Sequence, residues 1–223
     1  MGLLDDLKKQ AEMLQTQQNV QQSVQSDRIK LVEEKMKQTF QYVHELLKQL
    51  SVLKPTSPLV FYIMGVGDLK NLSFAEQFSD FRRKRINDKE YFDTINFYIK
   101  WASNNTMVIE RDNPPMAIKT REALYASKVK FTEEELKNPK GFVTGAKFII
   151  PAVVITDVQI KADHDQGRLV MQTKNLLGLG PDTFSLPAPE INDALLEEFG
   201  KALIGQPSNF RRFRAVAPNP SIR

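Results

Sequence analysis

Residues 29–53 read IKLVEEKMKQTFQYVHELLKQLSVL and decide the first part of the fold. This stretch has no Pro or Gly and is rich in Leu, Lys, Glu, Gln and Met, which are good helix formers. Its apolar side chains recur alternately three and four positions apart, the spacing of a coiled-coil seam. The seam consists of Ile29, Val32, Met36, Val43, Leu46, Leu50 and Leu53, with Thr39 at the one polar position. The pattern predicts a long helix with one apolar face that needs a partner.

The same helix extends toward the N-terminus, because no Pro or Gly follows Gly2 in this part of the chain. A second apolar stripe (Leu4, Leu7, Ala11, Leu14) lies near the start, in a register different from that of the seam. Between the two stripes, residues 15–25 contain six Gln. Amide layers can specify the register of a coiled coil, and a solvated linker between two helices is the alternative for this segment.

The seam has several possible partners: a second copy of the chain, the N-terminal segment folded back, a different protein, or the globular domain that follows. We predict self-association, which makes residues 1–54 an oligomerisation segment and the protein a homo-oligomer. Packing on the globular domain is the main alternative. Pro55 and Pro58 prevent the helix from continuing and mark a domain boundary.

Residues 58–205 have the pattern of an antiparallel α+β domain. Leu59–Met64 and Phe148–Ile160 are short apolar and β-branched runs typical of strands, and Pro151 indicates an edge, an entry point or a bulge in the second. Tyr91–Trp101 alternates with period two, and Asn104-Asn105 predicts a hairpin turn into the next strand. Strands joined by hairpins argue against an α/β nucleotide-binding fold.

Helices are predicted at three places in this domain. Ser73–Glu76 and Thr132–Glu135 have the form of capping boxes, which predict a short helix and a single helical turn. A third helix begins at Pro189 and ends at Gly205. The expected fold class is therefore α+β: a long coiled-coil-like N-terminal helix, an antiparallel-sheet domain and a C-terminal packing helix.

Charge and composition exclude several classes of protein and of functional site. Lys and Arg exceed Asp and Glu by 31 to 27, and this excess lies in the acid-free C-terminal segment, so residues 206–223 are predicted to be a basic, flexible tail. The absence of Cys excludes a disulfide scaffold, a Cys nucleophile and thiolate metal sites. No apolar run approaches the ~20 residues needed to span a bilayer, and no signal peptide is recognisable, so we expect a cytoplasmic protein.

Two basic clusters are candidate anion-binding sites: Arg82, Arg83, Lys84 and Arg85, and Arg211, Arg212 and Arg214. Guanidinium groups suit phosphate oxygens, and the Phe residues beside the second cluster could stack on a nucleic-acid base. Packing of Phe210 and Phe213 on the domain as a clasp is the interpretation we favour for that pair.

Candidate catalytic groups are few. His44 lies beside the seam, and His164 stands between Asp163 and Asp165, which are also the residue types that a tight turn needs. Gly65–Gly67 and Leu177–Gly180 lack the residues of a phosphate-binding loop. We identify no cofactor or metal site and no pairing of nucleophile and base.

The sequence therefore favours a non-catalytic cytoplasmic scaffold or interaction protein that self-associates through its N-terminal helix and displays α+β domains. A separate protein partner is also possible. A binding module for an anionic ligand or nucleic acid is the alternative, and a metal-dependent enzyme built around His164 is the third hypothesis.

Overall fold

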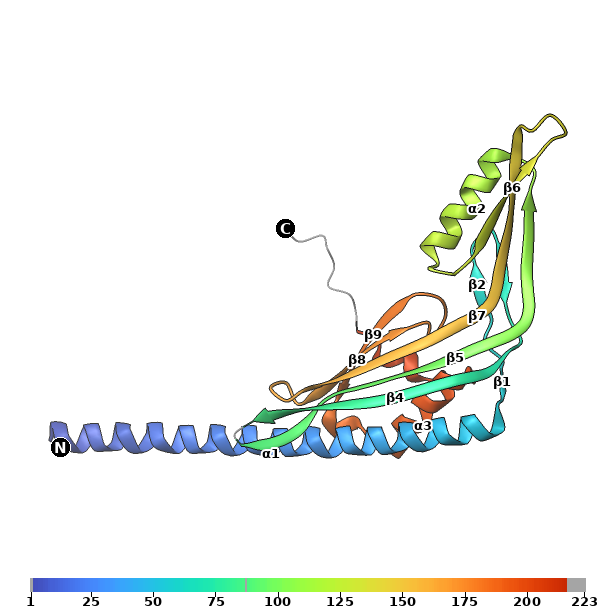
Figure 1. Ribbon diagram of the computed structural model, residues 1–223. Helices are drawn as coiled ribbons and strands as arrows, with labels where there is room; N and C mark the ends of the chain where they lie inside the picture. The colour runs from blue at the N-terminus through green and yellow to red at the C-terminus, as the bar shows by residue number, and fades with distance from the viewer. Residues whose placement is uncertain (1, 87, 216–223) are drawn as a thin grey trace.

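The computed structural model describes residues 2–86 and 88–215 (Figure 1). The helices are α1 (Leu3–Leu53), α2 (Pro114–Ala126) and α3 (Asp193–Ile204), with short 3-10 helices η1 (Ala188–Glu190) and η2 (Phe210–Phe213). The strands are β1 (Thr56–Ser57), β2 (Phe61–Ile63), β3 (Gly67–Leu69), β4 (Leu72–Ile86), β5 (Lys89–Arg111), β6 (Thr132–Lys137), β7 (Val143–Asp163), β8 (Arg168–Lys174) and β9 (Pro181–Pro187). The predicted class is confirmed: a long N-terminal helix, an antiparallel sheet and a C-terminal helix.

α1 is one continuous helix of 51 residues, about 76 Å long at ~1.5 Å per residue. It runs without interruption through the Gln-rich segment, so residues 15–25 are helical and do not form a linker. The helix ends where Lys54 adopts a left-handed conformation and donates its N–H to the Leu50 carbonyl at 2.9 Å. Pro55 then prevents another turn, as the sequence predicts.

The seam of α1 packs against the sheet of its own chain. Val32, Met36 and Val43 are completely buried in the main hydrophobic core, and Ile29 and Leu50 are also buried. Of the other seam residues, Leu46 is half-buried and Leu53 is exposed. The sequence analysis predicted that this seam contacts a second copy of the chain. For its buried members that prediction is corrected, because they pack on the globular domain of the same chain: Ile29, Val32, Met36, Val43 and Leu50.

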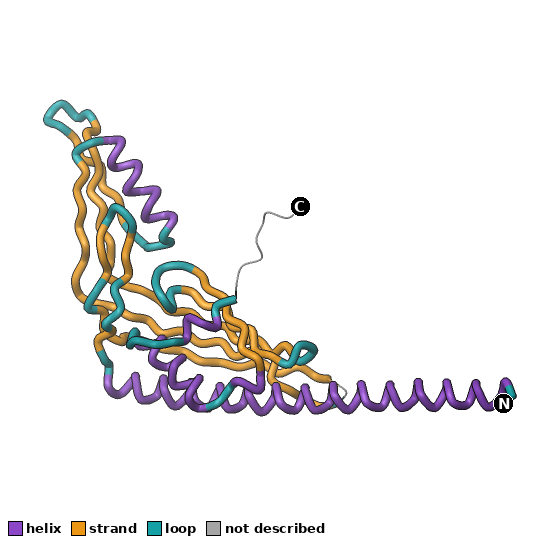
Figure 2. Tube along the Cα trace, turned by 180° about the vertical axis from the view of Figure 1, so that it is seen from behind, coloured by secondary structure: helices purple, strands orange, loops and turns teal. Residues whose placement is uncertain are grey.

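The seven-stranded sheet has the order β1-β4-β5-β7-β8-β9, with β6 added beside β7, and every neighbouring pair is antiparallel. β2 and β3 form a separate hairpin. β5 and β7 are long and bend together, which gives the molecule the shape of an L (Figures 1 and 2). The lower arm contains β4, β8, β9 and the adjacent halves of β5 and β7, with α1 and α3 packed on one face. The upper arm contains the remaining halves, β6 and α2.

The bend has a visible cause in the pairing of β5 with β7. Their register shifts between Ala102 and Thr106, and Thr106 lies opposite Pro151 of β7. Proline has no N–H to donate to the ladder of hydrogen bonds. A bulge opposite it disrupts this ladder locally and lets the two strands bend. The strand prediction for Phe148–Ile160 is confirmed. Of the edge, entry point or bulge expected at Pro151, the structure shows a bulge, and its extra residues lie in β5 between Ala102 and Thr106 rather than in β7.

Three local predictions inside the domain are wrong. Residues 72–86 form β4 and Thr132–Glu135 belongs to β6, where capping boxes predict helix. Asn104-Asn105 makes no hairpin, because β5 continues to Arg111. In each case pairing with a long neighbouring strand overrides a short sequence motif, since it forms many backbone hydrogen bonds at once. The sequence analysis missed α2. Asn113 caps it by accepting from the Met116 N–H, and the helix begins at Pro114.

The C-terminal helix is confirmed, but it begins at Asp193 rather than at Pro189, which lies in η1. The chain after it remains packed. Asn192 caps α3 by accepting from the Leu195 N–H at 3.0 Å, and Gly205 ends it with φ of 80°. Phe210 then inserts completely between Phe184 and Phe199, with ring centroids 4.9 and 5.0 Å away. The flexible tail predicted for residues 206–223 is therefore docked at Phe210, and its residues 216–223 lie outside the described part of the chain.

Candidate functional site

One face of the lower arm is open. Along β5, the side chains of Ile95, Phe97 and Ile99 are buried against the helices, whereas those of Asn96 and Tyr98 point to the other face and are half-buried. This alternation follows from the period of two along a strand. α1 and α3 both lie on the first face (Figures 1 and 2). On the second face, polar side chains such as Arg82, Asn96 and Gln159 are exposed or half-buried.

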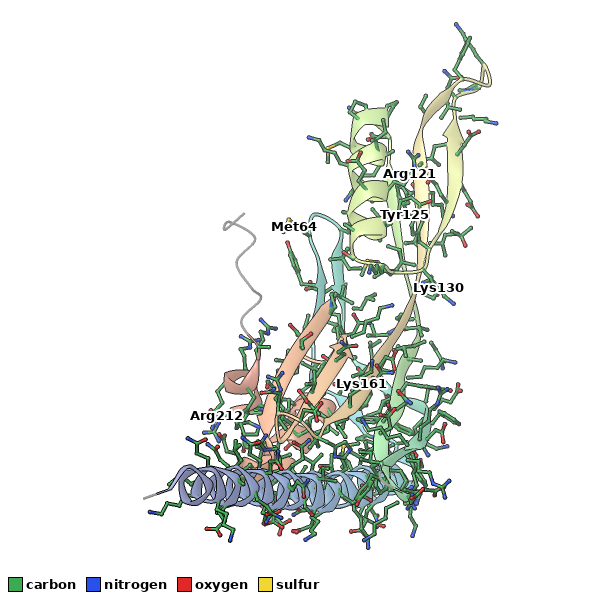
Figure 3. All side chains as sticks on the ribbon, turned by 90° about the vertical axis from the view of Figure 1, so that its left-hand side faces the viewer. Met64, Arg121, Tyr125, Lys130, Lys161 and Arg212 are labelled. Atoms are coloured by element: carbon green, nitrogen blue, oxygen red, sulfur yellow. The ribbon has the colours of Figure 1, made fainter. Side chains whose placement is uncertain are left out.

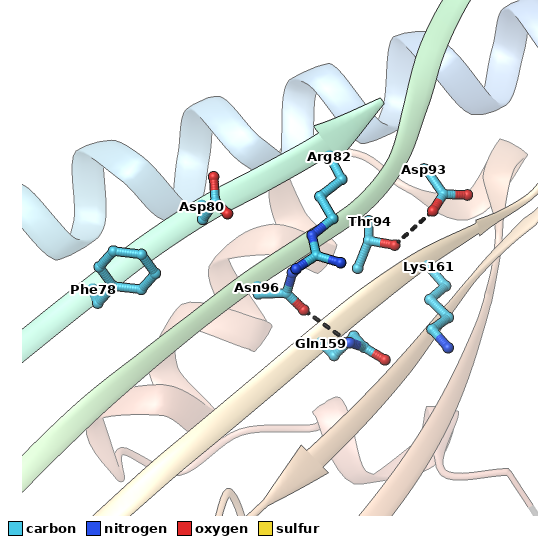
Figure 4. A pocket seen from close by; sticks show the side chains of 8 residues that line it. All are labelled: Phe78, Asp80, Arg82, Asp93, Thr94, Asn96, Gln159 and Lys161. Atoms are coloured by element: carbon cyan, nitrogen blue, oxygen red, sulfur yellow. Dashed lines mark hydrogen bonds between the residues drawn. The ribbon is translucent and has the colours of Figure 1, made fainter. Parts of the chain in front are cut away.

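A hollow of about 490 Å³ lies on this open face (Figure 4). It is lined by Phe78, Asp80 and Arg82 of β4, by Asp93, Thr94 and Asn96 of β5, and by Gln159 and Lys161 of β7. Its charged groups balance, two carboxylates against two cations. Two hydrogen bonds connect residues that line the hollow. Gln159 donates to Asn96 at 2.9 Å, and the Thr94 hydroxyl donates to Asp93 at 3.0 Å. Such a surface offers donors and acceptors but no deep apolar enclosure.

An aromatic pair lies at the edge of the hollow. Phe78 is 53% exposed and stacks on Tyr98 with ring centroids 6.1 Å apart. The Tyr98 hydroxyl donates to Glu76 at 2.6 Å, and Lys100 contacts the same carboxylate at 3.3 Å. These two hydrogen bonds lower the pKa of Glu76, and the bond to Glu76 raises the pKa of Tyr98. The ring of Phe78 is thus an exposed stacking surface beside fixed charges.

The Arg82–Arg85 cluster occupies the end of β4 and is exposed. Strand alternation divides it between two faces: Arg82 lines the hollow and Lys84 pairs with Asp93 at 3.4 Å, whereas Arg83 lies over the ring of Phe92 at 5.2 Å. The four cations therefore form a charged strand end rather than one patch.

The second basic cluster lies beyond the opposite edge of the sheet. Arg214 bridges to Phe184 of β9 and pairs with Asp182 at 2.7 Å, while Arg212 lies over the ring of Phe213 at 4.7 Å. Arg211 lines a smaller hollow of about 270 Å³ beside α3. Figure 3 shows Arg212 well away from Lys161 on the open face. Since β5, β7 and β8 separate β4 from β9 at ~4.8 Å per strand, the two clusters cannot hold one small ligand together.

His164 is buried, and the described side chains around it are not arranged as metal ligands. Its Nε2 lies 3.2 Å from the Phe92 carbonyl oxygen, while its Nδ1 has no hydrogen-bond partner among the described residues. Burial lowers the pKa of His164. Asp163 pairs with Arg168 at 2.9 Å, and Asp165 accepts from Gln25 at 3.3 Å, so neither carboxylate is directed at the imidazole. Within residues 2–86 and 88–215, no three His, Asp or Glu side chains are grouped as metal ligands.

Other sequence candidates also have structural explanations. His44 is exposed and stacks on Phe40 at 5.9 Å. Gly65 and Gly67 turn the β2–β3 hairpin, and the loop at Leu177–Gly180 is held by Asn175, whose side chain accepts from the Gly180 N–H at 2.9 Å. The described helices include none with the length and hydropathy needed to cross a bilayer.

The N-terminal part of α1 projects past the sheet (Figures 1 and 2). Every residue from Lys8 to Arg28 is exposed, and in its last turn Gln25 and Arg28 donate hydrogen bonds to Asp165 of the domain. Four large apolar side chains of this stretch are more than half exposed: Met13 71%, Leu14 59%, Val20 57% and Val24 51%. This projecting segment, residues 3–28, contains the first apolar stripe of the sequence analysis.

Comparisons of the chain with models of protein families, with curated proteins and with solved structures found no match.

Proposed function

We propose that the protein is a non-catalytic cytoplasmic interaction protein that self-associates through its projecting segment and displays its L-shaped domains from a helical stalk. The observation that carries this proposal is the uninterrupted exposure of α1 from Lys8 to Arg28. A helix with a single Ala in this stretch and several β-branched or small polar residues has little stability of its own in water. Association with another helix supplies the missing burial.

A second copy is the partner that this segment fits best. Its stripe of Leu4, Leu7, Ala11 and Leu14 continues at heptad spacing into Gln18, Gln21 and Gln25. A Gln amide both donates and accepts, so identical amides facing each other across a symmetric interface can satisfy one another. The segment carries Asp5, Asp6, Glu12 and Asp27 against Lys8, Lys9 and Arg28, so like-charge repulsion between copies is small.

Light scattering on the full chain and on a variant lacking residues 1–24 tests this proposal. The full chain should have a mass that is a multiple of 25.5 kDa, and the shortened chain should be monomeric. The shortened chain should still fold, because the seam from Ile29 onward remains on the sheet. A monomeric full chain at micromolar concentration would refute self-association.

A matched pair of substitutions locates the interface. Leu14→Asp places a charge on the apolar stripe, whereas Thr16→Asp places the same charge on the opposite side of the helix. We expect the first to dissociate the oligomer and the second to leave it intact. Equal effects of the two changes would show that the stripe is not the contact.

A second candidate function is binding of an anionic, ring-bearing ligand on the open face. It is favoured by the exposed ring of Phe78 next to Arg82 and Lys161 in one hollow. Fluorescence anisotropy with a labelled oligothymidine is the test. Lys161→Gln should weaken binding, and Lys147→Gln in the upper arm is the matched control, because Lys147 lies outside the hollow. No binding to the unmodified protein would dismiss this candidate.

A further inference from the structure

β4 is paired on one side only over most of its length. On its second side β1 covers just Leu72 and Ser73, and among the described residues no strand pairs with this side from Ala75 to Ile86. An unpaired edge of this length is a template for another extended segment.

Two hydrogen bonds show which backbone groups face this open edge. The Phe74 N–H donates to the Pro55 carbonyl at 2.9 Å, so even-numbered residues point outward before the bulge at Ala75. The bulge shifts the alternation by one residue. Beyond it, the Phe81 N–H donates to the Asp80 carboxylate at 2.8 Å instead of to β5, so odd-numbered residues point outward. Gln77, Ser79, Phe81, Arg83 and Arg85 therefore direct their backbone groups to the edge.

The side chains along this edge are positively charged at one end and apolar in the middle. No ion pair is found within the described residues for Arg82, Arg83 or Arg85. The carboxylate of Glu76 already accepts a hydrogen bond from Tyr98 and pairs with Lys100. Phe78 is 53% exposed on the open face and Phe81 is 38% exposed on the helix face. A strand laid along this edge would meet an aromatic ring on each face and, at its end, three guanidinium groups that form no ion pair within the described residues.

We propose that the open edge of β4, residues 75–86, is a docking strand for an extended acidic segment of a partner protein. The segment adds to the sheet, places β-branched side chains beside Phe78 and Phe81, and places carboxylates beside Arg82, Arg83 and Arg85. Charge complementarity selects an acidic partner over a second copy, because a second copy would bring four more cations to the same edge. The docking strand is separate from the projecting segment of α1, so its failure and the failure of self-association are distinguishable.

The test uses the full chain and a fluorescein-labelled peptide of about ten residues, the usual length of a strand. Its N-terminal half is Glu-rich and its C-terminal half alternates Val and Thr, the order for antiparallel addition; the reversed order tests parallel addition. A peptide of identical charge, N-methylated at alternate residues, lacks the amide donors that a strand needs. We expect N-methylation on the pairing side to weaken binding by about tenfold or more, as loss of several ladder hydrogen bonds requires.

Ser79 supplies a matched pair of variants. Ser79→Pro removes an outward N–H while leaving the ladder to β5 intact, and Ser79→Ala keeps that N–H. Binding should be lost in the first and kept in the second. Because the peptide series is run on the unmodified protein, it remains decisive if Ser79→Pro fails to fold.

Three results would overturn the proposal. The first is absence of binding by either peptide order. The second is equal affinity for the N-methylated peptide, which would show attraction by charge alone. The third is efficient oxidation of Ser79→Cys to a disulfide-linked dimer in the Leu14→Asp background, which would show that the edge pairs with a second copy; the chain has no other Cys.

Discussion

The phenol of Tyr42 on α1 lies against Gly200 on α3, so closely that a Cβ at position 200 would overlap the Tyr42 hydroxyl oxygen. Nearby, Gln38 of α1 donates to Asp193 at the start of α3 at 2.9 Å. Burial is the main cause that raises the pKa of Tyr42. These contacts join the first and last helices of the chain into one layer beneath the sheet. Because this layer packs on the sheet, the seam of α1 is already buried within a single chain.

The Tyr42–Gly200 contact predicts the sign of a simple substitution. In an exposed helix Gly→Ala stabilises by ~1 kcal/mol, but overpacking a tight contact costs ~1–3 kcal/mol. We expect Gly200→Ala to lower the free energy of unfolding in urea titrations. In a Tyr42→Ala background, where the ring is absent, the same change should be neutral or stabilising. A stabilised Gly200→Ala single variant would contradict the close approach.

Val43→Asp should destabilise the fold itself rather than only an oligomer. Val43 is completely buried against the sheet, and an unpaired buried charge costs ~3 kcal/mol or more. Gln41→Asp, on the exposed side of the same turn, is the control and should change stability by less than ~0.5 kcal/mol. Chemical denaturation followed by Trp101 fluorescence measures both. Equal stabilities would place the seam outside the core.

Phe210→Ser should loosen the C-terminal clasp. The ring of Phe210 fills the space between Phe184 and Phe199, and loss of such a ring costs ~3–5 kcal/mol. Arg212→Ser removes an exposed neighbour in the same turn and should change stability by less than ~0.5 kcal/mol. Limited proteolysis after residue 205 is a second readout, since the clasp shields this segment. A Phe210→Ser protein as stable as the parent would mean that the contact contributes nothing.

The protein should lose stability as the pH falls below the ordinary His pKa of 6.5. Burial lowers the pKa of His164 in the folded state, so the unfolded chain binds the proton at a higher pH than the folded one. Stability attributable to this group is fully present above pH 6.5 and is lost progressively as the pH falls toward the lower folded-state pKa. His164→Gln should flatten this dependence. Urea titrations at a series of pH values compare the two proteins, and an unchanged pH dependence in the variant would contradict the assignment to His164.

Removal of the whole α1 separates its two roles. A chain lacking residues 1–53 exposes the part of the core that covers Val32 and Met36, so it should fail to give a cooperative unfolding transition. A chain lacking only residues 1–24 should retain that transition. Circular dichroism during heating distinguishes the two outcomes. Cooperative unfolding of the shorter chain would show that the sheet is stable without its helix layer.

The sequence identifies the two clusters of cationic side chains, but it does not show which of these side chains share a face of the sheet. Both Arg clusters are exposed as their composition predicts, yet strand alternation divides Arg82 from Arg83, and sheet order separates them from Arg212. The hollow on the open face escaped sequence analysis, because Gln159 and Lys161 stand some 60 to 80 positions from Phe78, Arg82 and Asn96. No local spacing signals such a group. The alternation along residues 91–101 was the one available sign of an open face.

The sequence by itself determined the elements that local chemistry controls. The absence of Pro and Gly followed by Pro55 determines where α1 ends, and Gly205 determines where α3 ends. The start of α3 was expected at Pro189, four residues too early, because Pro189 belongs to the 3-10 helix η1. Only the tertiary structure decided that residues 72–86 form a strand and that the seam of α1 faces its own sheet. A heptad pattern specifies an apolar face but not what covers it, because burial of apolar surface is non-directional and any complementary surface stabilises it. Here the buried residues of β5 and β7 provide that surface, and they become a surface only when the sheet has formed.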